Sequence, residues 1–354
     1  MSFQLDRLVR ENIRRLRPYS SARSEFAGDA EVFLDANENA FGSPVGNGLN
    51  RYPDPLQMAL KARIAELRRV GTDQVFIGNG SDEAVDLLFR IFCRPGVDNV
   101  ITCPPTYGMY EVSAGINDIA VNHAPLNADF GLNAESMLAA VGENTKLVFV
   151  CSPNNPTGNL MDTSSVTDIL QHFPAIVVID EAYIDFAATP SWADRICDFP
   201  NLIVLQTLSK AWGLAGLRVG TAFADANIIA LMNKVKPPYN VSRVSQELAL
   251  TALENTDWLT QTVTETVSER KKLEQQLNAL SFVQTVYPSD ANFLLVRVSD
   301  AAATYRRLIA ERIVVRDRSK VELCEGCLRI TIGTAAENQL LMEALRNYET
   351  SIIY

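Results

Sequence analysis

The stretch from 207 to 220, TLSKAWGLAGLRVG, constrains the fold and chemistry of this chain more than any other. It follows an apolar run at 201–205 that predicts a buried strand, so Lys210 stands where the chain leaves that strand. The glycines and alanines that follow let the backbone pass close to a bound group. Ser209, Lys210 and Arg218 are donors that can converge on a carbonyl and a phosphate, which is the setting that a Schiff-base lysine requires. The alternative is a surface lysine beside a glycine-rich packing segment.

Length and charge bound the class of protein. At 354 residues the chain is long enough for a large domain with a smaller one attached. We expect an N-terminal arm over 1–30, a large domain over 31–240 and a small domain over 241–354. The net charge of −10 argues against nucleic acid and anionic membranes as partners. No apolar run reaches the ~18 residues of a membrane span and no secretory signal is visible, so we expect a cytoplasmic protein.

Continuous apolar runs alternate with helical patterns through most of the chain. Such runs predict strands that are covered on both faces, as in a mostly parallel sheet between layers of helices, which is an α/β fold. The expected strands of the large domain are 32–34, 75–77, 100–103, 146–151, 175–179 and 201–205. We also expect an amphipathic helix before residue 17 and a long helical stretch at about 242–280 that leads into a small α+β domain. Its expected strands are 292–297, 313–317 and 327–334.

Polar or glycine-rich residues follow several of these strands. G-N-G-S-D-E at 78–83 joins a strand to a helix N-terminus, where free N–H groups and the helix dipole favour an anion. It lacks the third glycine of a dinucleotide loop, and plain helix capping is the alternative. Asp180 ends a buried strand and needs a cationic partner, because an unpaired buried charge is costly. Arg329 interrupts another apolar strand, either in a structural ion pair or as a clamp for a carboxylate or phosphate.

Two further features carry less information. Tyr107, in the loop after 100–103, is an aromatic that can stack on a flat ring or belong to the core. The six cysteines are scattered, and the C-x-x-C of Cys324 and Cys327 has no second pair at zinc-ribbon spacing. We therefore favour incidental cysteines over a metal or redox site.

The motif S-K-x-x-G-x-A-G-x-R-x-G at 209–220 resembles the cofactor-lysine segment of the fold-type-I, pyridoxal-phosphate-dependent aminotransferases. N-P-T-G at 155–158 and D-E-A-Y at 180–183 precede it in the order that this family shows. The resemblance implies a seven-stranded sheet, pyridoxal 5′-phosphate as cofactor, and three catalytic residues, Lys210, Asp180 and Tyr183. The cofactor-binding residues that it implies are Tyr52, Ser81, Asp82, Tyr107, Asn155, Asp180, Tyr183, Ser209, Lys210 and Arg218.

The family pattern also implies a role for each of these residues. Lys210 carries the cofactor and moves a proton, Asp180 pairs with the ring nitrogen, and Tyr107 stacks on the ring. Asn155 and Tyr183 bond the phenolic oxygen. The residues implied at the cofactor phosphate are Ser81, Asp82, Ser209 and Arg218, together with Tyr52 from a neighbouring subunit.

Three N-terminal patterns, R-P-Y at 17–19, L-x-A-N-E-N at 34–39 and R-Y-P-D at 51–54, resemble the histidinol-phosphate aminotransferases more specifically. This implies a homodimer with shared sites, in which the substrate-binding residues are Tyr19, Asn37, Arg316 and Arg329. The implied reaction converts L-histidinol phosphate and 2-oxoglutarate to imidazole-acetol phosphate and L-glutamate in histidine biosynthesis. An aromatic amino-acid aminotransferase and a threonine-phosphate decarboxylase on the same fold are the alternatives. A pyridoxal-phosphate-binding regulator would need a DNA-binding domain, for which the residues before the cofactor domain are too few.

Overall fold

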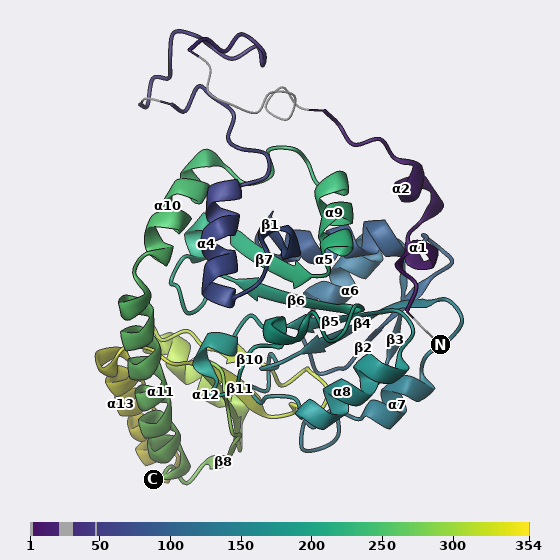
Figure 1. The fold of residues 1–354 in the computed structure, drawn as a ribbon. Coiled ribbons are helices and arrows are strands. Elements are labelled where there is room, and N and C mark those ends of the chain that lie inside the picture. Colours follow the sequence, from purple (N-terminus) through teal and green to yellow (C-terminus); the bar gives the residue numbers. More distant parts are fainter. Residues whose placement is uncertain (1–2, 21–30, 47, 354) are drawn as a thin grey trace.

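The computed structural model describes residues 3–20, 31–46 and 48–353, and a seven-stranded sheet forms its centre (Figure 1). The strands lie in the order β1, β7, β6, β5, β4, β2, β3. Neighbours from β6 to β3 are parallel, whereas β7 runs antiparallel to both β1 and β6. The bounds are β1 (Val75–Asn79), β2 (Asn99–Thr102), β3 (Ala120–His123), β4 (Thr145–Cys151), β5 (Ile176–Asp180), β6 (Leu202–Thr207) and β7 (Val219–Ala224). The predicted mostly parallel sheet is confirmed.

Both faces of the sheet are buried because its central strands are apolar along most of their length. In β5, Val177 and Ile179 point into one core, and Ile176 and Val178 point into the other, as the two-residue period of a strand requires. One core is closed by α4 (Met58–Arg68), α7 (Ala134–Ala139), α8 (Thr163–His172) and α10 (Arg243–Leu253). The other is closed by α5 (Ser81–Phe92), α6 (Met109–Ile116), α9 (Ala226–Val235), α1 (Leu5–Leu8) and α2 (Glu11–Arg15).

A smaller antiparallel sheet follows in the C-terminal part, with the strand order β10, β11, β9, β8. Its elements are α11 (Thr256–Asn278), β8 (Val283–Val286), β9 (Phe293–Val298), α12 (Ala301–Ala310), β10 (Arg316–Asp317), β11 (Cys327–Thr331) and α13 (Ala335–Ile353). Leu328 and Ile330 of β11 point into the core beneath α11–α13. The alternate residues Cys327 and Arg329 therefore lie on the other face, which packs against the large sheet.

The expected N-terminal elements are wrong in detail. The first helix is broken into α1 and α2, because the chain turns between them and Arg10 N donates to Ile91 O of α5 at 3.0 Å. Val9 and Ile13 are buried there, so docking on the core decides the local conformation. The expected strand at 32–34 is absent. Residues 31–46 and 48–57 instead belong to an extended loop that leaves the body of the protein (Figure 1).

Differences also occur later in the chain. The helical stretch at 242–280 is interrupted between α10 and α11, where Asn255 N donates to Ala252 O at 3.0 Å. The strands β3, β7 and β8 were not expected, because each is short, rich in small residues or half polar. Single-turn helices lie at η1 (Thr72–Gln74), η2 (Ile184–Phe186), η3 (Trp192–Arg195) and η4 (Ala215–Leu217). Within the described residues, no helix has the length and apolar character needed to cross a bilayer.

Candidate active site

The residues predicted to bind a cofactor meet in one cavity at the carboxyl ends of β4, β5 and β6, where open α/β sheets bind ligands. We call it the inner cavity. Its walls contain every predicted cofactor residue except Tyr52, namely Ser81, Asp82, Tyr107, Asn155, Asp180, Tyr183, Ser209, Lys210 and Arg218. Asn155 follows β4, Asp180 ends β5 and Lys210 follows β6. The parallel strands therefore deliver these side chains to the same edge of the sheet.

One end of the inner cavity is suited to an anion. Gly80 precedes α5 with a φ of +80°, and the free N–H groups of the first turn begin at Ser81. Arg218 Nη1 lies 3.4 Å from Ser209 Oγ at the same end. A Cβ on Gly220 of β7 would stand only 2.1 Å from Ser81 N. Glycine at this position is thus required for the start of α5 to lie beside the lysine segment.

The two carboxylates in the first turn of α5 do not occupy this anion site. Glu83 is directed outside the cavity, where its carboxylate accepts from Asn240 Nδ2 at 2.9 Å. Asp82 Oδ1 accepts from the Tyr107 hydroxyl at 3.1 Å, and its Oδ2 lies 3.5 Å from Arg218 Nη2. The charge of Asp82 is therefore balanced in part by Arg218, and the N–H groups remain available to a phosphate.

Asp180 is a buried carboxylate, 3% exposed, that has no ion-pair partner among the described residues. Its Oδ2 accepts from the Tyr110 hydroxyl at 2.7 Å and its Oδ1 from Ala182 N at 3.0 Å. Burial raises the pKa of Asp180, and these two hydrogen bonds oppose the rise. A protonated ring nitrogen in the cavity would supply the missing positive charge.

Tyr110 is a site residue that sequence reasoning missed. It is fully buried and its ring stacks on Phe149 of β4, with 4.8 Å between the centroids. The available signal is its position at the start of α6, three residues after Tyr107, which brings the two rings edge-on with 5.5 Å between their centroids. Tyr110 holds Asp180 in place while Tyr107 faces the cavity.

Lys210 combines access to the cavity with a lowered pKa. Burial is the main cause of the decrease and Arg329 the next, whereas Asp180 acts in the opposite direction. A lower pKa increases the fraction of neutral amine, which is the form that attacks a carbonyl or accepts a proton. The Lys210 Nζ atom lies 5.5 Å from the centroid of the Tyr183 ring. Tyr183 in turn packs edge-on against Phe293 of β9, at 5.1 Å, and so links the cavity to the small sheet.

A second cavity of about 560 Å³ opens from the inner one toward the small sheet, and we call it the outer cavity. Tyr107, Asn155, Tyr183 and Lys210 line both. The small sheet contributes three arginines to its wall: Arg316, Arg318 and Arg329. Arg329 Nη1 donates to Asn155 Oδ1, which leaves the Asn155 amide nitrogen for another acceptor.

The three arginines form an unbalanced cationic cluster. Arg316 and Arg329 are direct cross-strand partners on β10 and β11, an arrangement that destabilises a sheet when the charges are alike. Burial lowers the pKa of Arg329, and Arg318 and Arg316 lower it further. None of the three forms an ion pair within the described parts of the chain. The cluster is therefore a prepared site for an anion.

Three predicted site residues lie outside both cavities. Tyr19 is exposed at the end of the N-terminal helices. Asn37 and Tyr52 line a separate surface hollow, in which the Tyr52 ring stacks on Tyr239 with 4.4 Å between centroids. Within one chain, the structure does not bring these residues to Lys210.

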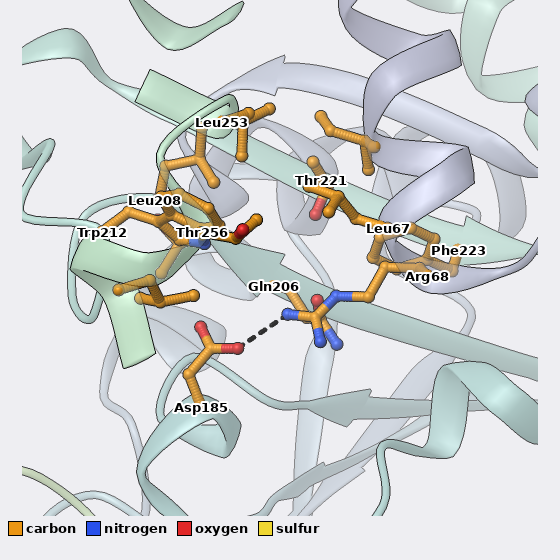
Figure 2. A pocket seen from close by; sticks show the side chains of 13 residues that line it. Leu67, Arg68, Asp185, Gln206, Leu208, Trp212, Thr221, Phe223, Leu253 and Thr256 are labelled. Carbon is orange, nitrogen blue, oxygen red and sulfur yellow. Dashed lines mark hydrogen bonds and ion pairs between the residues drawn. The ribbon is translucent and has the colours of Figure 1, made fainter. Parts of the chain in front are cut away.

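Figure 2 shows a further cavity behind the lysine segment, where Arg68 and Asp185 form an ion pair at 2.8 Å. Thr207 lines this cavity and the inner one. Close by, buried Glu181 accepts from Gln206 Nε2 at 2.8 Å and from the backbone at the start of η3. Burial raises the pKa of Glu181 to about 7. We interpret the hydrogen bonds of Glu181 as contacts that fix the carboxyl end of β5 on the side away from the inner cavity.

The described residues contain no group of three or more His, Cys, Asp or Glu side chains arranged to hold a metal ion. Cys324 and Cys327 are buried free thiols. Burial raises the pKa of Cys324 to about 12, which keeps the thiol protonated and poorly reactive.

The inner cavity fits pyridoxal 5′-phosphate in its donor chemistry. The anion site suits the phosphate, the unpaired Asp180 suits the ring nitrogen, and the Lys210 amine suits the aldehyde. The strand order of the large sheet and the donor chemistry of the inner cavity together define the class of fold-type-I pyridoxal-phosphate enzymes.

Comparison with known proteins narrows the class. The family model for aminotransferases of class I and II matches residues 29–345, and the chain belongs to this family of pyridoxal-phosphate-dependent transaminases. It is 54% identical to a histidinol-phosphate aminotransferase of Parabacteroides distasonis over 96% of this chain and 97% of that one. A second relative with that name, from Cytophaga hutchinsonii, is 50% identical over 98% and 100%. The solved histidinol-phosphate aminotransferase of Sinorhizobium meliloti, a complex with pyridoxal 5′-phosphate, has a TM-score of 0.80, 27% identity and 90% coverage of both chains.

Proposed function

We propose that this transaminase converts L-histidinol phosphate and 2-oxoglutarate to imidazole-acetol phosphate and L-glutamate, a step of L-histidine biosynthesis. The observation that carries the proposal is the arginine cluster of the outer cavity, which lies directly beside Lys210. A phosphorylated amine needs this positive charge, because a phosphate carries nearly two negative charges at neutral pH. The names of the relatives at about 50% identity point to the same substrate.

Each residue of the two cavities has a task in this proposal. Bound pyridoxal phosphate supplies an electron-accepting ring that stabilises negative charge at the substrate Cα. Lys210 Nζ, with its lowered pKa, accepts the proton from that carbon. Asp180, fixed by Tyr110, holds positive charge on the ring nitrogen. Arg329 and Arg316 bind the anionic end of the substrate, and Arg329 also takes the carboxylate of 2-oxoglutarate or glutamate.

The substrate assignment is tested by presenting single amino donors to the holoenzyme. We would follow the absorbance of the bound cofactor while adding L-histidinol phosphate, L-phenylalanine or O-phospho-L-threonine, and would identify the products. The proposal requires that histidinol phosphate converts the cofactor at the lowest concentration and that 2-oxoglutarate restores it. Faster conversion by phenylalanine would instead make the enzyme an aromatic amino-acid aminotransferase. Release of carbon dioxide from phosphothreonine would make it a decarboxylase.

We further propose a homodimer in which Tyr52 completes the phosphate site of the partner subunit. Leu34 and Phe41, in the loop that leaves the body of the chain, expose nearly all of their apolar surface, which favours burial against a second copy. Stacking on Tyr239 holds the Tyr52 ring in a fixed position at the surface. Lys236 Nζ fixes the same segment by donating to Pro55 O at 2.6 Å. A rigid, exposed aromatic is suited to reach another molecule.

Subunit complementation tests the sharing of sites. Lys210→Ala and Tyr52→Ala chains, each weak alone, would be co-expressed with different tags so that the mixed dimer can be purified. If Tyr52 serves the partner, each mixed dimer regains one native site and therefore about half of the activity of the wild-type dimer. If Tyr52 acts within its own chain, no native site forms and the mixed dimer stays as weak as its parents. A monomer in sedimentation analysis would refute the dimer itself.

We also propose a cytoplasmic location. All six cysteines are free thiols, as is usual for proteins kept in a reducing compartment. Cell fractionation with antibody detection is the direct test, and recovery outside the cytoplasmic fraction would refute it.

A further inference from the structure

We propose that Arg318 is a specificity-determining residue of the outer cavity, which makes the site prefer a doubly charged phosphate over a carboxylate. The proposal rests on the proposed function and refines it. Arg316 and Arg329 were expected from the family pattern, whereas Arg318 carried no expected role. The structure places its side chain in the same cavity as Lys210.

The strand geometry brings Arg318 to the anion site. Arg318 N donates to Cys327 O at 2.9 Å, so the pairing of β10 with β11 continues one residue beyond β10. Side chains two residues apart on a strand lie on the same face, which puts Arg318 beside Arg316. Asp317 lies on the opposite face, where its carboxylate accepts from Ser319 N at 2.8 Å. Asp317, which lies between the two arginines in sequence, therefore caps the following turn instead of pairing with them.

The guanidinium of Arg318 is half-buried and has no protein partner among the described residues. Its Nε is buried without a hydrogen bond, and no ion pair includes it. Burial lowers the pKa of Arg318, and the neighbouring Arg316 lowers it further. A buried donor without a partner costs free energy, which a bound anion would recover.

The acidic groups of the outer cavity do not neutralise Arg318. Glu111 and Glu322 are the carboxylates on the cavity wall. Glu111 Oε1 is paired with His123 Nε2 at 3.1 Å, and no ion pair joins Glu322 to an arginine in the described structure. Three guanidinium groups thus line the ligand cavity, whereas a bidentate pair with a single carboxylate uses one.

A third cation favours phosphate because the electrostatic interaction energy grows with the charge of the ligand. Removing Arg318 should therefore weaken a dianion more than a carboxylate. A hydrogen bond to a charged group corresponds to roughly 10- to 100-fold in affinity. We expect the KM for histidinol phosphate to rise by about that factor in Arg318→Gln, and the KM for glutamate in the reverse reaction to rise only about two- to threefold.

The experiment compares three variants of the holoenzyme. Arg318→Gln removes the charge, Arg318→Lys retains it, and Lys320→Gln removes an exposed charge nearby that does not line the cavity. For each variant we would measure KM and kcat for both donors, the dissociation constant of inorganic phosphate by calorimetry, and the unfolding midpoint. The measurements would be repeated across pH 5–8, where a phosphate monoester such as histidinol phosphate gains its second charge near pH 6.

The expected result in Arg318→Gln is a much larger loss for phosphate ligands than for glutamate, and for histidinol phosphate this loss should grow as the pH rises through about 6. Arg318→Lys should recover most of the phosphate affinity, and Lys320→Gln should resemble the wild type. Equal losses for phosphate and carboxylate ligands, or no loss, would overturn the assignment. The two proposals fail separately. If the wild type binds phosphate through Arg318 but does not turn over histidinol phosphate, only the proposed substrate is refuted and the role of Arg318 stands.

Discussion

Replacing Lys210 by alanine is expected to lower transamination by about 10⁴-fold or more, because one side chain supplies both the covalent link to the cofactor and the proton transfer. The lowered pKa of Lys210 increases the fraction of the neutral amine that both tasks need. Turnover of the best amino donor and the visible absorbance of the purified enzyme would be measured together.

Lys210→Arg is the matched control for this variant, since it keeps a long cationic side chain in the same place. Arginine remains protonated at all accessible pH values and cannot act as nucleophile or base. We therefore expect it to be as inactive as the alanine variant while binding the phosphate end normally. Activity of either variant within tenfold of the wild type would contradict the role of Lys210.

Asp180→Asn is expected to reduce kcat by about 10²- to 10³-fold without unfolding the protein, because it removes the charge that balances a cationic ring nitrogen. Asparagine has the same shape and keeps one acceptor oxygen, for Tyr110 or for Ala182 N but not for both, so the fold should persist with one of the two hydrogen bonds lost. The rate constants of both half-reactions, followed by stopped-flow absorbance, are the direct measurement.

Glu181→Gln is the control beside it in the chain. Glu181 is equally buried, but its carboxylate is held by Gln206 and η3 and does not line the inner cavity. We expect kcat to stay within a few-fold of the wild type.

The pKa of Glu181 is raised to about 7, so the folded state binds this proton more tightly and the wild type loses stability as pH rises from about 4.5 to 7. A neutral glutamine removes this dependence of stability on pH. In the kinetic comparison, a large fall in kcat for Glu181→Gln would mean that removing any buried charge lowers kcat, so that the effect of Asp180→Asn would not be specific to Asp180.

The part of the site that follows from sequence is the part built at strand ends. Asn155, Asp180 and Lys210 each stand at the end of an apolar strand or within four residues of it, and parallel strands place such positions together. Tyr110 and Arg318 escaped because their roles depend on tertiary partners. Tyr110 looks like an ordinary core aromatic until Asp180 is placed against it, and Arg318 looks like a charged turn residue until its register with Cys327 is known.

The same limit explains the errors in the fold. β7 reads VGTAFA, which has no long apolar run, yet it forms because β1 and β6 pair with it on both sides. The run at 32–34 is apolar, yet it is not part of either sheet in the described structure. The pattern of apolar residues gives the tendency of a segment to form a strand, and the presence of neighbouring strands decides whether the strand forms.

The position of β1 has a consequence for the order in which the site is assembled during synthesis. β1 pairs with β7 alone, and about 140 residues of chain separate them. The N-terminal half of the anion site at Ser81 therefore leaves the ribosome long before the strand that holds it exists. Contacts of such long range form slowly, because the intervening chain must first be ordered. The cofactor pocket is thus closed by a strand made late, and a nascent chain shorter than about 224 residues has no place for the phosphate.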